Sequence, residues 1–313
     1  MNSFNDIRRK KLIDRIRSVG IDLDKLNYIY IINGYLINIG SLRVGKGSGE
    51  LGESDSPVIK LPDGKPYIPG SSLKGVLRSA AEIVARSEGL EICEPSPSIT
   101  SFNVCSLTAE LLTRIYYALI SGKTLNGKWF NSVMKGIERK YHGKVGEDLF
   151  KDIRKTYENE GIEGVVSKYA PCTVCQLFGN TSLASHVEVM DSIPETNTYV
   201  LSRTRVSIDR FRGAARGPAL FTYEYVPRGI KWKFRLVIKN VDLLGNDVKS
   251  KILRSVLSLL ASDEGFITVG GMKSVGLGHV KLLSDEVKVT KYVIKDFRLV
   301  KECELKLKEV IKS

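Results

Sequence analysis

The segment Ile68-Pro-Gly-Ser-Ser-Leu-Lys-Gly-Val-Leu-Arg78 gathers groups that bind phosphate. A turn ends an extended stretch, and Ser71 or Ser72 is a good N-cap for the helix that follows. Lys74 and Arg78 are four positions apart, so both lie on one face of that helix. Hydroxyls, free backbone N–H groups at the positive end of a helix and two cations together predict a site for a polyanion.

A carboxylate, Asp55, lies in the glycine-rich stretch just before this segment. An isolated loop aspartate is usually a turn former, and Glu50, Glu53 and Asp63 are nearby alternatives for any chemistry. The three histidines of the chain show no paired spacing, and no nucleophile–His–Asp arrangement is present. On the residues alone, acid–base or metal-dependent catalysis at Asp55 is the less common of two interpretations.

A second basic cluster is richer in arginine and lies between residues 201 and 218. Asp209 is the only acidic residue inside it. Arginine favours bidentate contact with phosphate and stacking on bases, so the cluster predicts contact with nucleic acid. The alternative is a solvated charged hairpin. The arginines are Arg203, Arg205, Arg210, Arg212 and Arg216.

A glycine-rich stretch, Gly270-Gly-Met-Lys-Ser-Val-Gly-Leu-Gly278, offers a third place for a phosphate. Glycines let a backbone approach a phosphate closely, and Lys273 and Ser274 are suited to contact it. The stretch is neither a Walker loop nor a dinucleotide fingerprint. A tight β-turn is the equally good alternative.

Cys172-Thr-Val-Cys175 has the spacing of half a zinc site. Cys93 and Cys105 flank a loop rich in proline and serine and are candidates for the other half. His142 or His186 is an alternative to one of the cysteines. Four cysteines around a structural zinc are favoured over buried free thiols.

The composition agrees with a nucleic-acid partner. The 313-residue chain carries a formal net charge of +13, and 42% of its residues are hydrophobic, enough for a large core. An acidic membrane surface or a basic enzyme are the other interpretations of such a charge. No apolar run approaches the roughly 20 residues that span a bilayer, and the N-terminus lacks the apolar core of a signal peptide. We expect a cytoplasmic protein with reduced cysteines.

The elements that must position these residues are predicted from hydrophobic periodicity. Helices are expected over 3–25, 72–87, 107–121, 146–159 and 247–262. Strands are expected over 28–44, as one long strand or two short ones, and over 185–191, 199–205 and 279–283, with a hairpin that pairs 219–225 with 231–238. Residues 45–56 are expected to form an exposed loop.

With the helical stretch removed, the order of elements is that of a split βαβ sheet. The fold class is therefore α+β: an RRM-like or ferredoxin-like antiparallel sheet with an inserted helical subdomain. The predicted parts are an N-terminal helical extension (1–26), a core (27–89 and 176–285) with a hairpin at about 192–222, an insertion with the cysteine site (90–175) and a charged C-terminal tail (286–313).

Five motifs in this order resemble the RAMP superfamily of CRISPR-associated proteins, and more closely the backbone subunit of type III effector complexes. They are Asp55-Ser-Pro-Val-Ile-Lys60, Ile68-Pro-Gly-Ser-Ser-Leu-Lys-Gly75, Cys175-Gln-Leu-Phe-Gly179, Arg205-Val-Ser-Ile-Asp-Arg210 followed by Gly217-x-x-x-Phe-x-x-Glu224, and Gly270-Gly-x-x-Ser-x-Gly-x-Gly278. The resemblance covers roughly residues 28–283.

The resemblance implies an RRM-like core, a zinc-bearing lid and a thumb-like hairpin that enters the guide–target duplex. Copies of the chain are expected to stack along CRISPR RNA. The implied partners are CRISPR RNA, target RNA, other RAMP subunits, a small helical subunit and a large polymerase-like subunit.

The family's loop aspartate matches Asp55, and the resemblance implies that it cleaves paired target RNA with Mg²⁺ or Mn²⁺. The main alternative is an inert scaffold of the same complex that binds the guide without cleaving. A free endoribonuclease that processes CRISPR precursor RNA ranks lower, because such enzymes use a histidine or tyrosine acid–base site. An enzyme that does not act on RNA ranks lowest.

Overall fold

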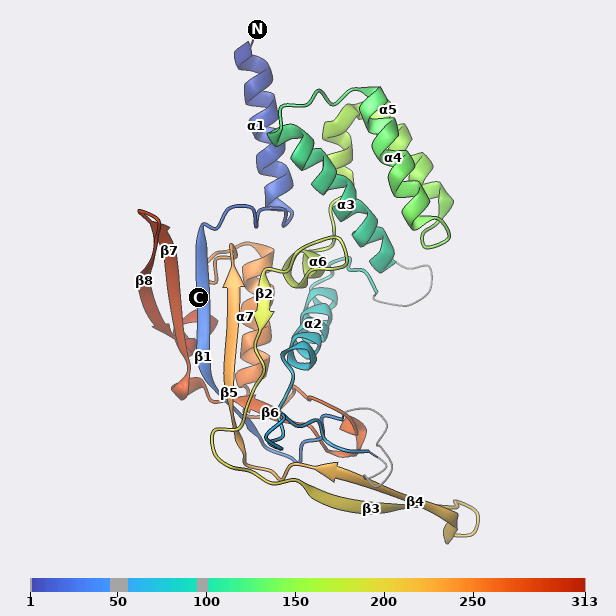
Figure 1. Ribbon diagram of the computed structural model, residues 1–313, viewed down its shortest axis with the longest axis vertical. Coiled ribbons are helices and arrows are strands. Elements are labelled where there is room, and N and C mark those ends of the chain that lie inside the picture. Colours follow the sequence, from blue (N-terminus) through green and yellow to red (C-terminus); the bar gives the residue numbers. More distant parts are fainter. Residues whose placement is uncertain (1, 46–55, 95–100, 313) are drawn as a thin grey trace.

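The computed structural model describes residues 2–45, 56–94 and 101–312. A sheet occupies the middle of the elongated molecule, a helical body lies at one end and a two-stranded hairpin projects from the other (Figure 1). No helix in these ranges is both long and apolar enough to cross a membrane.

Strand β1 (Tyr28–Asn38) forms the centre of the main sheet. Its aromatic and β-branched residues suit a strand with neighbours on both sides. It pairs in antiparallel fashion with β5 (Lys231–Lys239) on one side and with β7 (Lys288–Lys295) on the other. Three further strands complete the sheet, namely β2 (Val187–Val189) beside β5, β6 (Val280–Leu282) beside the end of β1, and β8 (Arg298–Lys306) beside β7.

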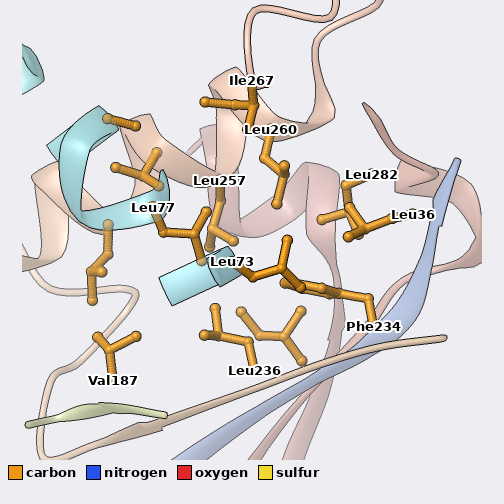
Figure 2. Close-up of a cluster of buried hydrophobic side chains, with 14 of the residues drawn as sticks. Leu36, Leu73, Leu77, Val187, Phe234, Leu236, Leu257, Leu260, Ile267 and Leu282 are labelled. Carbon is orange, nitrogen blue, oxygen red and sulfur yellow. The ribbon is translucent and has the colours of Figure 1, made fainter. Parts of the chain in front are cut away.

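Helices α2 (Gly70–Ser87) and α7 (Val248–Ala261) cover one face of this sheet. Leucines at helical spacing point from both helices toward apolar residues of β1, β5 and β6, as Figure 2 shows. Each fully buried leucine contributes roughly 2 kcal/mol by leaving water. The order β1-α2-β2 followed by β5-α7-β6 is the split βαβ arrangement predicted from the sequence. A short helix, α8 (Leu307–Lys312), packs beside α7.

The helical body has a hydrophobic core of its own. It is built from α1 (Asn2–Ser18), α3 (Ser101–Ile120), α4 (Gly127–Tyr141) and α5 (Glu147–Lys168), which is kinked at Gly161. Its α3 and α5 include most of the helices expected over 107–121 and 146–159, whereas α4 was not predicted. Helix α1 ends at Ser18, short of the predicted 25, because Gly20 turns the chain with a φ of +90° against Gln176.

The β3–β4 hairpin consists of β3 (Leu201–Ile208) and β4 (Ala215–Tyr225) and forms a separate two-stranded sheet. The predicted pairing of 219–225 with 231–238 is therefore wrong. Residues 215–225 pair back onto β3, and β5 lies between β1 and β2. The reason is that the buried, alternating face of β5 packs on α2 and α7, whereas β3 is exposed along most of its length.

The sequence predicts a charged tail over residues 286–313, but the structure has β7, β8 and α8 in this range. Opposite charges face each other across these two strands, with Lys291 Nζ 2.9 Å from Glu302 Oε2. Cross-strand ion pairs stabilise a sheet without an apolar alternation in the sequence. The β-branched and aromatic residues of β7 were a strand signal, but they lie among charged residues and were assigned to a charged tail.

Candidate nucleic-acid interface and metal centre

Four cysteines from distant parts of the chain meet between the two hydrophobic cores. Cys93 follows α2, Cys105 belongs to α3, and Cys172 and Cys175 lie at the start of the short helix α6 (Thr173–Phe178). Their sulfur atoms all lie within 4.8 Å of one another, and three of the four residues are buried. The set is the one predicted from the spacing.

The cysteine cluster fits a tetrahedral metal ion. With metal–sulfur bonds of about 2.3 Å, tetrahedral geometry places sulfur atoms about 3.8 Å apart. The Cys93 sulfur lies 3.3 Å from that of Cys175 and 3.5 Å from that of Cys172. Backbone N–H groups point at two sulfurs, that of Cys172 at Cys105 Sγ and that of Cys175 at Cys172 Sγ. Hydrogen bonds from the neighbouring thiols, that of Cys105 first, lower the pKa of Cys172.

Neither histidine alternative belongs to the cysteine cluster. His186 is buried and its ring nitrogens contact the Gln176 carbonyl at 2.8 Å and the Asp22 carboxylate at 2.6 Å. His142 is exposed and lies 2.9 Å from a carboxylate oxygen of Glu147. The donor set of the candidate metal centre is therefore four cysteine sulfurs.

Arg78 lies at the cysteine cluster and donates hydrogen bonds to protein groups. Its guanidinium contacts Glu82 Oε1 at 3.0 Å, the Gly179 carbonyl at 2.8 Å and Cys175 Sγ at 3.3 Å. The sequence grouped Arg78 with the phosphate-binding residues. In the structure its Nε, Nη1 and Nη2 each donate to a group of the fold.

The start of α2 also differs from the predicted N-cap. The helix begins at Gly70, with Pro69 at the N-cap position and no side-chain cap. The Asp191 carboxylate accepts the Gly70 N–H at 2.7 Å, so an acidic side chain already contacts this end of the helix. The expectation that Ser71 or Ser72 caps the helix is thus wrong.

Three side chains in the first turns of α2 remain candidates for contact with a polyanion. Ser71 is exposed, and Ser72 and Lys74 are half-buried. Burial lowers the pKa of Lys74. These three residues lie in the first turns of α2, beside β2.

Asp55 lies outside the described residues, and the residues on either side of 46–55 contact each other and the β3–β4 hairpin. Gly45 bridges to Val58, which brings the two ends together, and Ser56 bridges to Tyr223 of β4. The Glu224 carboxylate accepts the Val58 N–H at 2.9 Å and an ammonium hydrogen of Lys60 at 3.1 Å. The base of the β3–β4 hairpin therefore holds the segment 56–60 that follows Asp55.

The glycine-rich stretch packs against residues 41–45, the described segment that precedes Asp55 in the chain. The Gly271 N–H donates to the Arg43 carbonyl at 2.8 Å, and a Cβ at Gly270 would lie only 2.0 Å from that oxygen. Close approach of two backbones explains the glycine at 270. Lys273 and Ser274 are exposed on a short 3-10 turn and remain free to meet a ligand.

Arg203, Arg210 and Arg212 of the β3–β4 hairpin are exposed, and Arg205 is half-buried. Arg203 and Arg205 lie over the rings of Tyr225 and Tyr223, 5.0 and 5.1 Å from the ring centroids. At the tip, the Asp209 carboxylate accepts backbone N–H groups instead of pairing with an arginine. Among the described residues no ion pair neutralises four of the predicted arginines, which are Arg203, Arg205, Arg210 and Arg212. Arg216 lies in β4.

Arg43 was not identified from the sequence. Its Nε is buried without a hydrogen-bond partner among the described residues, and so is the hydroxyl of nearby Tyr223. Burial lowers the pKa of Arg43, and a Cβ at Gly271 would lie 2.9 Å from its Nη1. In the sequence, the signal for a buried arginine was its position between two apolar residues, Leu42 and Val44, which are both buried in the structure.

A model of one protein family, described as the RAMP superfamily, matches residues 36–281. The chain belongs to the RAMP superfamily. The matched range includes the cysteine cluster, the β3–β4 hairpin and the glycine-rich stretch, whereas α1, β7 and β8 of this RAMP protein lie outside it.

Part of this RAMP protein is similar to a curated protein of Methanothermobacter thermautotrophicus, the CRISPR system Cms endoribonuclease Csm3. The two are 47% identical over 57 residues. The similar stretch spans 17% of this chain and 23% of the Methanothermobacter protein.

Proposed function

We propose that this RAMP protein is a backbone subunit of a cytoplasmic type III CRISPR effector complex, which binds guide RNA and cleaves paired target RNA through Asp55. One observation carries the proposal. Arg203 and Arg205 of the β3–β4 hairpin, the glycine-rich stretch and the residues that flank Asp55 on both sides lie together at the base of one hairpin. The name of the Methanothermobacter relative supports the same role.

The proposed chemistry divides between two strands of RNA. Exposed arginines and the groups at the start of α2 bind the guide backbone, because phosphate contacts position nucleic acid without reading its sequence. At the target strand, a ribose 2′-hydroxyl oxygen forms a bond to the adjacent phosphorus and the 5′ oxygen leaves. Asp55 ligates a divalent ion or accepts the proton of the attacking hydroxyl. Mg²⁺ or Mn²⁺ supplies charge stabilisation there.

Cleavage by the assembled complex tests this assignment. With complementary RNA and Mg²⁺, the wild-type complex should yield regularly spaced products, and Asp55→Ala should abolish them while leaving guide binding intact. Asp63→Ala is the matched control, because Asp63 is an exposed acidic residue in the turn that follows. Spaced cleavage that persists in Asp55→Ala would favour the alternative, a guide-binding scaffold that leaves catalysis to another group.

We also propose that the cysteine cluster holds a structural zinc ion, which stabilises the junction of the two cores. Elemental analysis of the purified chain should give about one zinc per molecule, and Cys172→Ser should lose it. Cys303→Ser is the control, because that cysteine lies in β8 outside the cluster. Equal zinc content in Cys172→Ser and the wild type would exclude the site.

A further inference from the structure

We propose that Arg78 supports the four-cysteine metal centre, in place of the direct RNA contact that the sequence suggested. In this role its guanidinium offsets the negative charge of the metal-bound thiolates and fixes the orientation of Cys175. The inference rests on the zinc site proposed above and is independent of what the RNA interface binds.

The geometry around Arg78 is that of a positioning residue. Its side chain is 17% exposed and spans the gap between α2 and the segment after α6. Nη2 faces Cys175 Sγ at 3.3 Å, and Nη1 donates to the Gly179 carbonyl at 2.8 Å. The Glu82 carboxylate, 11% exposed and one helical turn along, accepts from Nε at 3.0 Å and holds the guanidinium plane.

Gly179, which accepts the hydrogen bond from Arg78 Nη1, belongs to the turn that follows the cysteines of α6. Its N–H donates to the Cys175 carbonyl at 2.9 Å, which closes α6. Its φ is +76°, and a Cβ there would lie 2.8 Å from the Leu183 carbonyl oxygen. The carbonyl that receives Arg78 is therefore fixed by the same turn that follows the Cys172–Cys175 pair.

The hydrogen bond from Arg78 to Cys175 offsets part of the negative charge of the metal-bound thiolates. A divalent ion with four thiolates carries a formal charge of −2, and charge in a buried site is costly unless it is paired and hydrogen-bonded. A guanidinium that donates to one sulfur removes part of this cost and orients the ligand. Groups in this outer position typically change metal affinity by about 10- to 100-fold when they are removed.

Zinc affinity of the full chain tests the proposal directly. Competition with a chromophoric chelator should show affinity weakened by about 10- to 100-fold in Arg78→Gln. Arg86→Gln is the matched control, because Arg86 lies two turns further along α2 and is exposed. It should bind zinc as the wild type does. Wild-type affinity in a folded Arg78→Gln overturns the proposal.

A second variant covers the case in which Arg78→Gln does not fold. Arg78→Lys keeps the charge, but a single ammonium cannot contact Glu82, Gly179 and Cys175 in the same arrangement. With Co²⁺ in place of zinc, the thiolate-to-metal charge-transfer band of this variant should shift relative to that of the wild type. A wild-type spectrum together with wild-type zinc affinity in Arg78→Lys overturns the proposal.

Two further outcomes distinguish the role of Arg78 from the zinc site and from the RNA interface. If the wild-type chain binds neither zinc nor cobalt, the proposed metal centre is wrong, and the proposed role of Arg78 is wrong as well. With zinc saturating, the salt dependence of RNA binding should be the same in Arg78→Gln and the wild type. A slope reduced by about one with unchanged zinc affinity would assign Arg78 to a phosphate instead.

Discussion

The arginines of this molecule divide according to what their N–H groups contact. Arg78 and Arg254 are largely enclosed and donate to carbonyls, carboxylates or sulfur of the fold itself. Arg203 and Arg205 lie over tyrosine rings, and neither forms an ion pair among the described residues. Arginines of the first kind have several of their N–H groups engaged by the fold, so a count of arginines along the sequence does not by itself measure the surface open to a phosphate.

Arg205→Ala should weaken RNA binding by the assembled complex with little dependence on the RNA sequence. The reason is that a phosphate contact contributes counterion release, so the slope of log affinity against log salt should fall by about one. Binding titrations at several salt concentrations measure this slope.

Arg298→Ala is the control for Arg205→Ala. Arg298 is an exposed arginine in β8, at the opposite edge of the main sheet from β2 and outside the range that the family model matches. Its removal should leave the slope unchanged. If Arg205→Ala also leaves it unchanged, the β3–β4 hairpin does not contact phosphate at this residue.

At the scale of single elements, some predictions succeeded because one physical signal dominated. Helices α2 and α7 have clean apolar stripes, and the Cys172–Cys175 spacing fixed half of the metal site. The partner of 219–225 was wrong because strand propensity does not specify pairing. The role of Arg78 depends on Gly179, about a hundred residues away, so local sequence contains no signal for it.

The glycine-rich stretch allows a stability test with an internal control. Gly270→Ala should lower the free energy of unfolding by roughly 2–4 kcal/mol, because its Cβ would overlap the Arg43 carbonyl oxygen. Gly276→Ala should cost only about 1 kcal/mol, since Gly276 has a positive φ of +85° but open space around it. Urea unfolding measures both values. Equal losses would mean that backbone conformation alone requires the glycines.

At the scale of the whole molecule, two hydrophobic cores are joined through the cysteine cluster. Removing the metal with a chelator should therefore lower the thermal midpoint by roughly 10 °C, because a structural zinc contributes several kcal/mol and each kcal/mol is worth about 2–4 °C in a chain of this size. Calorimetry with and without chelator checks this, and added zinc should restore the midpoint. An unchanged midpoint would contradict a stabilising metal.

The two tryptophans report on the two cores separately. Trp129 packs against the core of the helical body, and Trp232 is fully buried in the core of the sheet. Ile16→Ala removes a buried side chain of α1 and should cost about 2–5 kcal/mol in the helical body. Fluorescence of single-tryptophan variants during urea unfolding should show a larger shift at Trp129 than at Trp232. Equal shifts would mean that the cores unfold as one unit.

The position of α1 has a consequence for how the chain is made. Leu12 and Ile16 are buried against α3 and α5, and the Arg8–Glu163 ion pair joins residues 155 positions apart. Because α1 is synthesised before α3 and α5, its apolar side chains cannot pack until most of the helical body has left the ribosome. Until then these side chains stay open to chaperones and to other nascent chains, so synthesis rate and chaperone supply should govern the yield of this protein more than its final stability does.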